Sequence, residues 1–249
     1  MNIAIVGYGG MGKMVAQAAQ EKGLTISAII DPVAKEATHK KVDSNALKGV
    51  DVAIDFTHPS AVLENIRVYC DTKTNAVVGT TGWYDRLPEV KQMVQKSGIG
   101  FLWGSNFSVG VNIYFRIVEN AAKLVNKAEQ YDVWGFEIHH HTKSDSPSGT
   151  AKSLSDILIK NISRKKKAVY EMLNRKIAKD EFHFASVRGG PVNFEHTIGF
   201  DSAADCLTLK HAARNRQGYA EGAVLAALWL GKKKGYFELD DFMKGLLGE

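Results

Sequence analysis

The stretch NIAIVGYGGMGK, residues Asn2–Lys13, decides the fold of the first part of the chain. Asn2–Val6 is a short apolar run of the kind found in strands that are buried on both faces of a sheet. Glycines in the pattern G-x-G-x-x-G follow it, and a segment with helical periodicity starts at Gly10. A strand, a glycine turn and a helix in this order predict the first unit of a parallel α/β sheet.

The same alternation continues through about the first hundred residues. Strand-like runs lie at 24–30, 51–56, 76–79 and 99–103, and helix-like segments lie at 10–22, 60–71 and 87–97. Apolar strands that alternate with helices predict a parallel sheet with helices on both faces, the Rossmann type of α/β fold.

The pattern changes after about Ser108. A long amphipathic segment at 111–128 is followed by a strand-like run at 131–139 and a helix-like segment at 149–162. Strand-like runs at 181–188, 192–201 and 205–212 then follow one another, separated by short turns. This order predicts a second, α+β domain with a mostly antiparallel sheet. We expect domains at 1–108 and 109–214, with the helices of 215–249 packing back on the first domain.

Composition narrows the class of protein. No apolar run approaches the roughly 18 residues needed to cross a bilayer, so no membrane association is expected. The net charge of +5 is mild, and the basic runs at 164–167 and 232–234 contain no aromatic residues, so nucleic acid is not an expected partner. Two cysteines and an N-terminus without a basic leader favour a cytoplasmic protein.

The glycine turn predicts a dinucleotide site formed by Gly7, Tyr8, Gly9, Gly10, Met11 and Gly12. The free amides and the dipole at the start of the helix favour a pyrophosphate there. Asp31 ends the next strand, where it would accept hydrogen bonds from ribose hydroxyls. The turn also nearly matches a nucleotide-triphosphate loop, G-x-x-x-x-G-K, but Met14 stands where a hydroxyl would bind magnesium.

The expected cofactor is NADH, NADPH or both, with a preference for NADH. Asp31 is followed by Pro32, where an arginine would bind a 2′-phosphate, and a carboxylate nearby would repel that phosphate. Lys35, Lys40 and Lys41 lie further along and leave room for NADPH.

A second motif is EIHHHTKSDSPSGTA, residues Glu137–Ala151. On a strand Glu137, His139 and His141 would share one face, which is one possible metal site, but Lys143 would place a cation beside the ion. A hydrolase is disfavoured because Ser148 is not in a G-x-S-x-G elbow. The pattern favours an anion site: the helix that starts near Ser148 offers free amides, and Lys143 and the histidines offer charge and protons. We expect no metal.

These motifs are similar to those of the 4-hydroxy-tetrahydrodipicolinate reductases, also called dihydrodipicolinate reductases. The family signature E-x-HH-x-x-K-x-D-x-PSGTA is close to residues 137–151, and the resemblance covers essentially the whole chain. It is supported by DFTHP at 55–59, GTTG at 79–82, SNFSVGVN at 105–112, RGG at 188–190, EHT at 195–197 and KHA at 210–212.

The resemblance implies an NAD(P)H-dependent oxidoreductase of lysine and diaminopimelate synthesis that reduces a cyclic unsaturated dicarboxylate. It implies that His139 is the general acid and Lys143 a second proton donor. It also implies two domains that close on a hinge, and a homotetramer built from the second domain's sheets. Its substrate contacts would be His140, Gly149 and Thr150, to which the predicted helix start adds Ser148, and its nicotinamide contacts would be Gly79, Thr80, Thr81, Ser105, Asn106, Phe107 and Ser108.

The sequence departs from the family pattern at three places. Thr142 and Ser146 replace residues that are commonly basic and alanine, and the glycine turn is one residue shorter, without an arginine before Met11. The missing arginine bears on cofactor preference, since it is a candidate phosphate contact. An alternative function is a dinucleotide-binding sensor or scaffold of the same fold without catalysis. A thiol-dependent dehydrogenase is disfavoured because neither cysteine has an activating base nearby in sequence.

Overall fold

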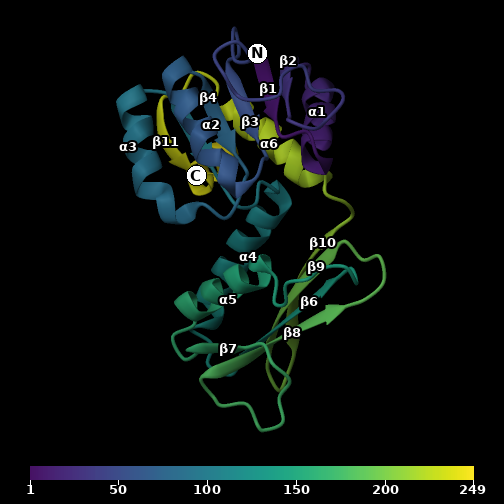
Figure 1. Ribbon diagram of the computed structural model, residues 1–249. Coiled ribbons are helices and arrows are strands. Elements are labelled where there is room, and N and C mark those ends of the chain that lie inside the picture. The colour runs from purple at the N-terminus through teal and green to yellow at the C-terminus, as the bar shows by residue number, and fades with distance from the viewer. The chain divides into compact units, whose positions relative to one another are not determined.

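A computed structural model describes all residues, 1–249, as two compact units (Figure 1). The first unit consists of Met1–Val109 together with Gln217–Glu249, and the second of Gly110–Arg216. The C-terminal helices are therefore part of the first unit. The unit boundaries lie within two residues of the ends predicted from the sequence. No helix is long and apolar enough to cross a membrane.

The first unit contains a six-stranded sheet in the order β11-β5-β4-β3-β1-β2, and all its pairings are parallel. The strands are β1 (Asn2–Val6), β2 (Thr25–Ile30), β3 (Val52–Asp55), β4 (Asn75–Val78), β5 (Gly100–Trp103) and β11 (Gly235–Glu238). The helices are α1 (Gly10–Glu21), α2 (Pro59–Thr72), α3 (Leu87–Ser97), α6 (Gln217–Leu230) and α7 (Leu239–Leu247), with a 3₁₀ turn η1 (Tyr84–Arg86).

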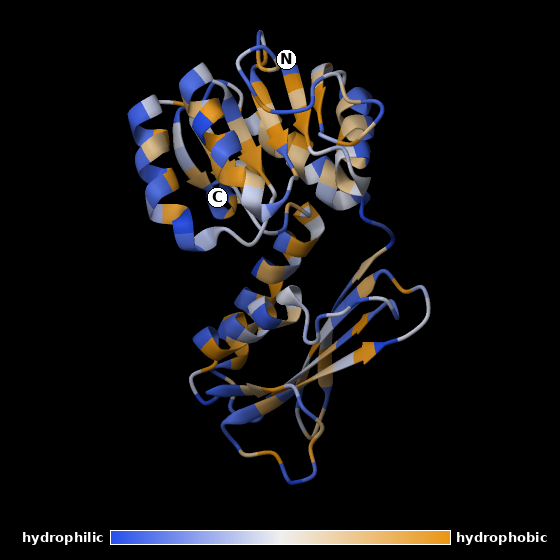
Figure 2. Cartoon of the chain, viewed as in Figure 1, coloured by the Kyte–Doolittle hydropathy of each residue, from blue (hydrophilic) through white to orange (hydrophobic).

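Alternate residues of these strands enter two separate apolar cores. Ile3 and Ile5 of β1 pack with α1, α6 and α7, whereas Ala4 and Val6 pack with α2 and α3 on the opposite face. The strands are orange in Figure 2 and the outer surfaces of the helices are largely blue, as a sheet covered on both faces requires. The prediction of a Rossmann-type sheet is confirmed. Strand β11 was not predicted.

The second unit contains a five-stranded sheet in the order β10-β9-β6-β8-β7. The strands are β6 (Asp132–His139), β7 (Lys167–Val169), β8 (Glu181–Arg188), β9 (Phe194–Asp201) and β10 (Cys206–Ala213). The helices α4 (Val109–Val125) and α5 (Gly149–Asn161) pack on one face of this sheet through Tyr114, Val118, Leu154 and Leu158 (Figure 1).

The pairing of the second sheet is mixed. Strands β10, β9 and β6 are antiparallel, as predicted, but β6 pairs with β8, and β8 with β7, in parallel. The reason is the helix α5 in the connection after β6, which returns the chain to the same end of the sheet and makes a parallel crossover possible. Successive strand-like runs alone did not reveal this.

Candidate active site

The glycine turn combines two sterically required glycines with one that faces open space. Gly7 has φ +84°, and a Cβ there would lie 2.2 Å from the backbone oxygen of Phe56. A Cβ on Gly12 would lie 2.0 Å from the oxygen of Gly7, so helix α1 packs directly against the turn. A Cβ on Gly9 would meet nothing within 4 Å. Gly9 therefore leaves space that a ligand can use.

The start of helix α1 is not occupied by the protein's own groups. Gly9 is its N-cap, without a side-chain hydrogen bond, and the first turn, which contains Gly10 and Met11, carries no acidic residue. A cavity of about 560 Å³ adjoins this turn, lined among others by Gly9, Asp31, Lys40 and Lys41. Free amides beside a cavity with two lysines fit a phosphate-bearing ligand.

Asp31 connects the glycine turn to the turn that follows β2. Its Oδ2 accepts a hydrogen bond from the amide of Tyr8 at 2.8 Å, and its Oδ1 accepts from the amides of Val33 and Ala34 at 2.8 and 2.7 Å. Partial burial opposes ionisation, but these bonds keep the pKa of Asp31 below its ordinary value. The carboxylate is thus ionised and fixed at the cavity wall.

A buried carboxyl group organises the loops after β3 and β4. Asp55 is 0% exposed, and it accepts hydrogen bonds from Thr57, Thr80, Asn65 and Tyr69. Burial raises the pKa of Asp55, and the hydrogen bonds lower it in part. Asp55 was not predicted as a site component, although it begins the DFTHP motif.

The remaining predicted nicotinamide contacts lie around this carboxyl group and the end of β5. Gly79 packs against the ring of Phe56, which a Cβ would approach to 2.1 Å, and the hydroxyl of Thr80 donates to Asp55. Phe107 is buried in the core edge-to-face with Phe56. Thr81 and Ser105 are exposed, and the side chain of Asn106 accepts from the amide of Ser108 at 3.0 Å.

The second unit contains a buried cluster centred on Glu137 of β6, which is 0% exposed. Its Oε1 accepts hydrogen bonds from the Ser148 amide at 3.0 Å, the Ser186 hydroxyl at 2.8 Å and Arg188 at 2.9 Å. Its Oε2 accepts from the Ser148 hydroxyl and from Nε2 of His196 at 3.1 Å. Burial opposes ionisation, but these bonds hold the pKa of Glu137 far below its ordinary value.

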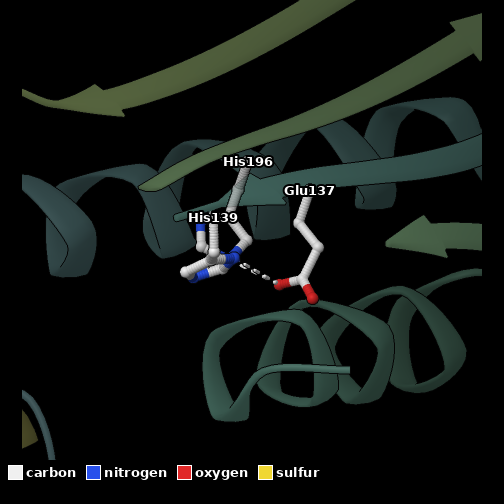
Figure 3. Close-up of side chains that lie close together, drawn as sticks. All are labelled: Glu137, His139 and His196. Carbon is white, nitrogen blue, oxygen red and sulfur yellow. Dashed lines mark hydrogen bonds and ion pairs between the residues drawn. The ribbon is translucent and has the colours of Figure 1, made fainter. Parts of the chain in front are cut away.

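His139 lies on the same face of β6 as Glu137 and is only 5% exposed. Figure 3 shows His139, His196 and Glu137 gathered together. Nδ1 of His139 lies 3.5 Å from Oε2 of Glu137. The His139 ring stacks on Phe194, with centroids 6.0 Å apart. Burial, aided by the positive charge of Arg188 and Lys143, lowers the pKa of His139 to about 4, although Glu137 opposes the shift. His139 is therefore neutral at pH 7 in the free protein.

Glu137, His139 and His196 have ligand atoms within 4.8 Å of one another, a spacing that a metal ion could bridge. Arg188 already neutralises the same carboxylate at 2.9 Å, and a bound cation would be held beside that guanidinium. The arrangement is better described as a hydrogen-bonded ion pair than as a metal centre.

The loop between β6 and α5 carries the other predicted groups. Nδ1 of His140 lies 2.6 Å from the Thr142 hydroxyl, and Nζ of Lys143 lies 2.6 Å from Oδ1 of Asp145. His141 is exposed and contacts the oxygen of Gly190 at 3.1 Å. The structure therefore separates the three histidines: the first is buried in the cluster, and the other two lie on the loop.

Helix α5 begins where the sequence predicts. Ser148 is its N-cap, and the Ser148 hydroxyl accepts a hydrogen bond from the Ala151 amide at 3.1 Å. Helix geometry leaves the amides of Gly149 and Thr150 without an acceptor within the helix, and space is open beside Gly149. No acidic residue lies in the first turn, so this end of the helix is suited to an anion.

Comparisons with known proteins agree over the whole chain. The family description "Dihydrodipicolinate reductase, N-terminus" matches residues 1–107, and "Dihydrodipicolinate reductase, C-terminus" matches residues 110–243. The 4-hydroxy-tetrahydrodipicolinate reductase of Christiangramia forsetii is 34% identical over 246 residues, which cover 99% of each chain. That of Ralstonia nicotianae is 34% identical over 266 residues, covering 98% of this chain and 99% of the relative.

A solved structure shows the same fold. The dipicolinate-bound dihydrodipicolinate reductase from Paenisporosarcina sp. TG-14 superposes with a TM-score of 0.79 at 21% identity, covering 97% of this chain and 98% of the other. A probable dehydrogenase from Thermotoga maritima has a TM-score of 0.63 at 9% identity, covering 99% and 94%.

Proposed function

The chain belongs to the dihydrodipicolinate reductase family, and on that premise we propose which of its residues carry out the family's reaction. It is an oxidoreductase that converts 4-hydroxy-tetrahydrodipicolinate to tetrahydrodipicolinate in lysine and diaminopimelate synthesis: the 4-hydroxyl group leaves as water, and a reduced pyridine nucleotide reduces the unsaturated ring. The alternative of a catalytically inactive sensor or scaffold receives no support from the relatives.

The cofactor is bound by the glycine turn of the first unit. Gly9 and the first amides of α1 would hold its pyrophosphate, because the space beside Gly9, where a larger residue would carry a Cβ, is open. Asp31 accepts from the adenosine ribose, which favours NADH. Lys40 and Lys41 line the same cavity and allow NADPH as a weaker alternative. When bound, the reduced nicotinamide supplies the hydride.

The substrate's carboxylates are bound at the start of α5. The amides of Gly149 and Thr150 receive one carboxylate, because helix geometry leaves them without an acceptor within α5 and the Ser148 cap binds the Ala151 amide instead. Lys143 and His140, on the loop before this helix, add positive charge and hydrogen-bond donors. Glu137 is neutralised within the cluster by Arg188, so it does not repel the dianion.

His139 supplies the proton that completes the reduction. Its Nδ1 is the nitrogen near Glu137, so Nε2 is the atom that carries the transferable proton. Glu137 stabilises the imidazolium that forms when the negative substrate arrives, since its charge raises the pKa of His139. Lys143, whose Nζ lies 2.6 Å from Oδ1 of Asp145, is the second proton donor.

We propose a homotetramer formed through the sheet of the second unit, in a cytoplasmic protein. The sheet face opposite α4 and α5 carries Trp134, Phe136 and Ile138 of β6, all half-buried in the single chain. Val187 on β8 is 41% exposed. A contiguous apolar face of this kind is typical of an interface between copies.

The observation that carries this function is the buried His139 beside Glu137 and the open start of α5. The test is a coupled assay in which a synthase makes the unstable substrate from pyruvate and aspartate semialdehyde, and oxidation of NADH and NADPH is followed at 340 nm. We expect oxidation of both, faster with NADH. No oxidation of either cofactor would refute the function, and a rate that favours NADPH would refute the assignment of Asp31.

A further inference from the structure

We infer that Glu137 is a positioning residue: its buried carboxylate assembles the substrate-carboxylate site by holding Ser148, Arg188 and His196 in place. The inference rests on the proposed function and adds to it a residue that does not itself touch the substrate or the cofactor.

The carboxylate of Glu137 joins four elements of the second unit. Hydrogen bonds reach it from the cap of α5 (Ser148), from β8 (Ser186 and Arg188) and from β9 (His196), while Glu137 itself lies on β6. The register explains this meeting, because Glu137 is directly opposite Ser186 on one side and His196 on the other. A carboxylate with all its acceptor positions in use is held in one orientation.

The contact with Ser148 decides how helix α5 presents its first turn. Glu137 accepts from both the amide and the hydroxyl of Ser148, so both donors of that residue are committed to one carboxylate. The hydroxyl oxygen is then oriented to accept from the Ala151 amide at 3.1 Å. What remains free at the start of the helix is the pair of amides that binds the substrate.

A second route runs through Arg188 to the loop before α5. Arg188 donates to Glu137 at 2.9 Å and to the backbone oxygen of Asp145 at 2.6 Å. Asp145 in turn pairs with Lys143 at 2.6 Å. Loss of the Glu137 charge would leave Arg188 without its carboxylate partner, and the loop that carries Lys143 would lose its anchor.

The chain offers a matched control in Glu181. This carboxylate lies on β8, is 8% exposed, pairs with Arg175 at 2.7 and 2.9 Å and lies 3.7 Å from Nζ of Lys167. Its other hydrogen bond comes from the Ala178 amide. None of these partners binds α5 or the loop at 140–148, so removing the Glu181 charge tests the cost of losing an ion-paired carboxylate of this sheet alone.

The experiment compares Glu137→Gln with Glu181→Gln in the full-length protein with NADH bound. Binding of dipicolinate, a stable dianionic analogue, is measured by calorimetry, together with KM, kcat and their pH dependence. For Glu137→Gln we expect dipicolinate affinity to fall at least tenfold, NADH affinity to change less than twofold, and the alkaline limb of the kcat profile, where His139 loses its proton, to move to lower pH. Glu137→Asp should recover part of the affinity, and Glu181→Gln should bind dipicolinate as the wild type does.

Wild-type dipicolinate affinity and an unchanged pH profile in Glu137→Gln would overturn the inference, as would an equal loss in Glu181→Gln. If Glu137→Gln does not fold, Ser186→Ala removes a single bond to Oε1 and should weaken dipicolinate binding two- to fivefold; no change there would also overturn it. Absence of turnover in the wild type would instead refute the proposed function, because dipicolinate binding does not depend on turnover.

Discussion

Binding of a dicarboxylate should draw one proton from solvent onto His139. Burial lowers the pKa of His139 to about 4, so at pH 7 only about one molecule in a thousand of the free protein carries the imidazolium. A proton donor in that state has no proton to give. The substrate has to bring about protonation through its own negative charge.

The magnitude follows from Coulomb's law. A carboxylate about 5 Å from the ring, at an effective dielectric constant of about 20, stabilises the imidazolium by about 3 kcal/mol. That corresponds to a rise of about 2.4 in the pKa of His139 for each carboxylate. Two carboxylates at similar distances would raise the pKa from about 4 to about 8 or 9, and to about 7 if one lies further away. Between half a proton and one proton should therefore be taken up at pH 7.

The assay is titration calorimetry of dipicolinate into the NADH-bound protein, in buffers with different heats of ionisation. The slope of the observed enthalpy against the buffer enthalpy gives the number of protons taken up. The number should be greatest near pH 6, where the free protein is unprotonated and the complex protonated, and it should vanish in His139→Gln. A slope of zero for the wild type between pH 6 and 7, or an equal slope in His139→Gln, would refute the reasoning.

Three other predictions concern stability and cofactor binding. Because the pKa of His139 is lowered from 6.5 to about 4, the unfolded chain takes up a proton at higher pH than the folded protein does, so folding stability falls as pH drops through this window. Between pH 7 and pH 4.5, the free energy of unfolding measured with urea should fall by about 2.5 kcal/mol less in His139→Gln than in the wild type. Ser148→Ala should lower the free energy of unfolding by about 1–2 kcal/mol through loss of the cap, and an unchanged urea midpoint would contradict this. Gly9→Ala should leave the melting temperature unchanged but weaken NADH binding at least tenfold. Gly12→Ala, whose Cβ would lie 2.0 Å from a backbone oxygen, should lower the melting temperature. Equal melting temperatures for the two variants would count against the assigned roles.

Much of the fold can be predicted from the sequence because its signals are local. The apolar run at Asn2–Val6 and the glycine turn after it are contiguous, and the structure places β1 and α1 there. The Pro-Ser-Gly-Thr sequence likewise gives the N-cap of α5 at Ser148. In each case the deciding interactions lie within a few residues of one another.

The parts of the fold and of the site that the sequence does not predict depend on contacts between distant residues. His196, Ser186 and Arg188 meet Glu137 because of the registers of β9 and β8 with β6, which the sequence does not contain as a local pattern. The motifs RGG and EHT were noted, but nothing local indicates that their Arg188 and His196 share one carboxylate. Strand β11 was missed for a related reason: its four residues are marked as a strand only by pairing with β5.

The measurement that tests the central claim most directly is the turnover of His139→Gln set against its affinity for NADH. If His139 delivers the proton from the site that Glu137 organises, kcat in the coupled assay should fall by about 100-fold or more, while the Kd for NADH stays within twofold of the wild type. A kcat equal to that of the wild type would remove His139 from the acid role, and with it the account of this site.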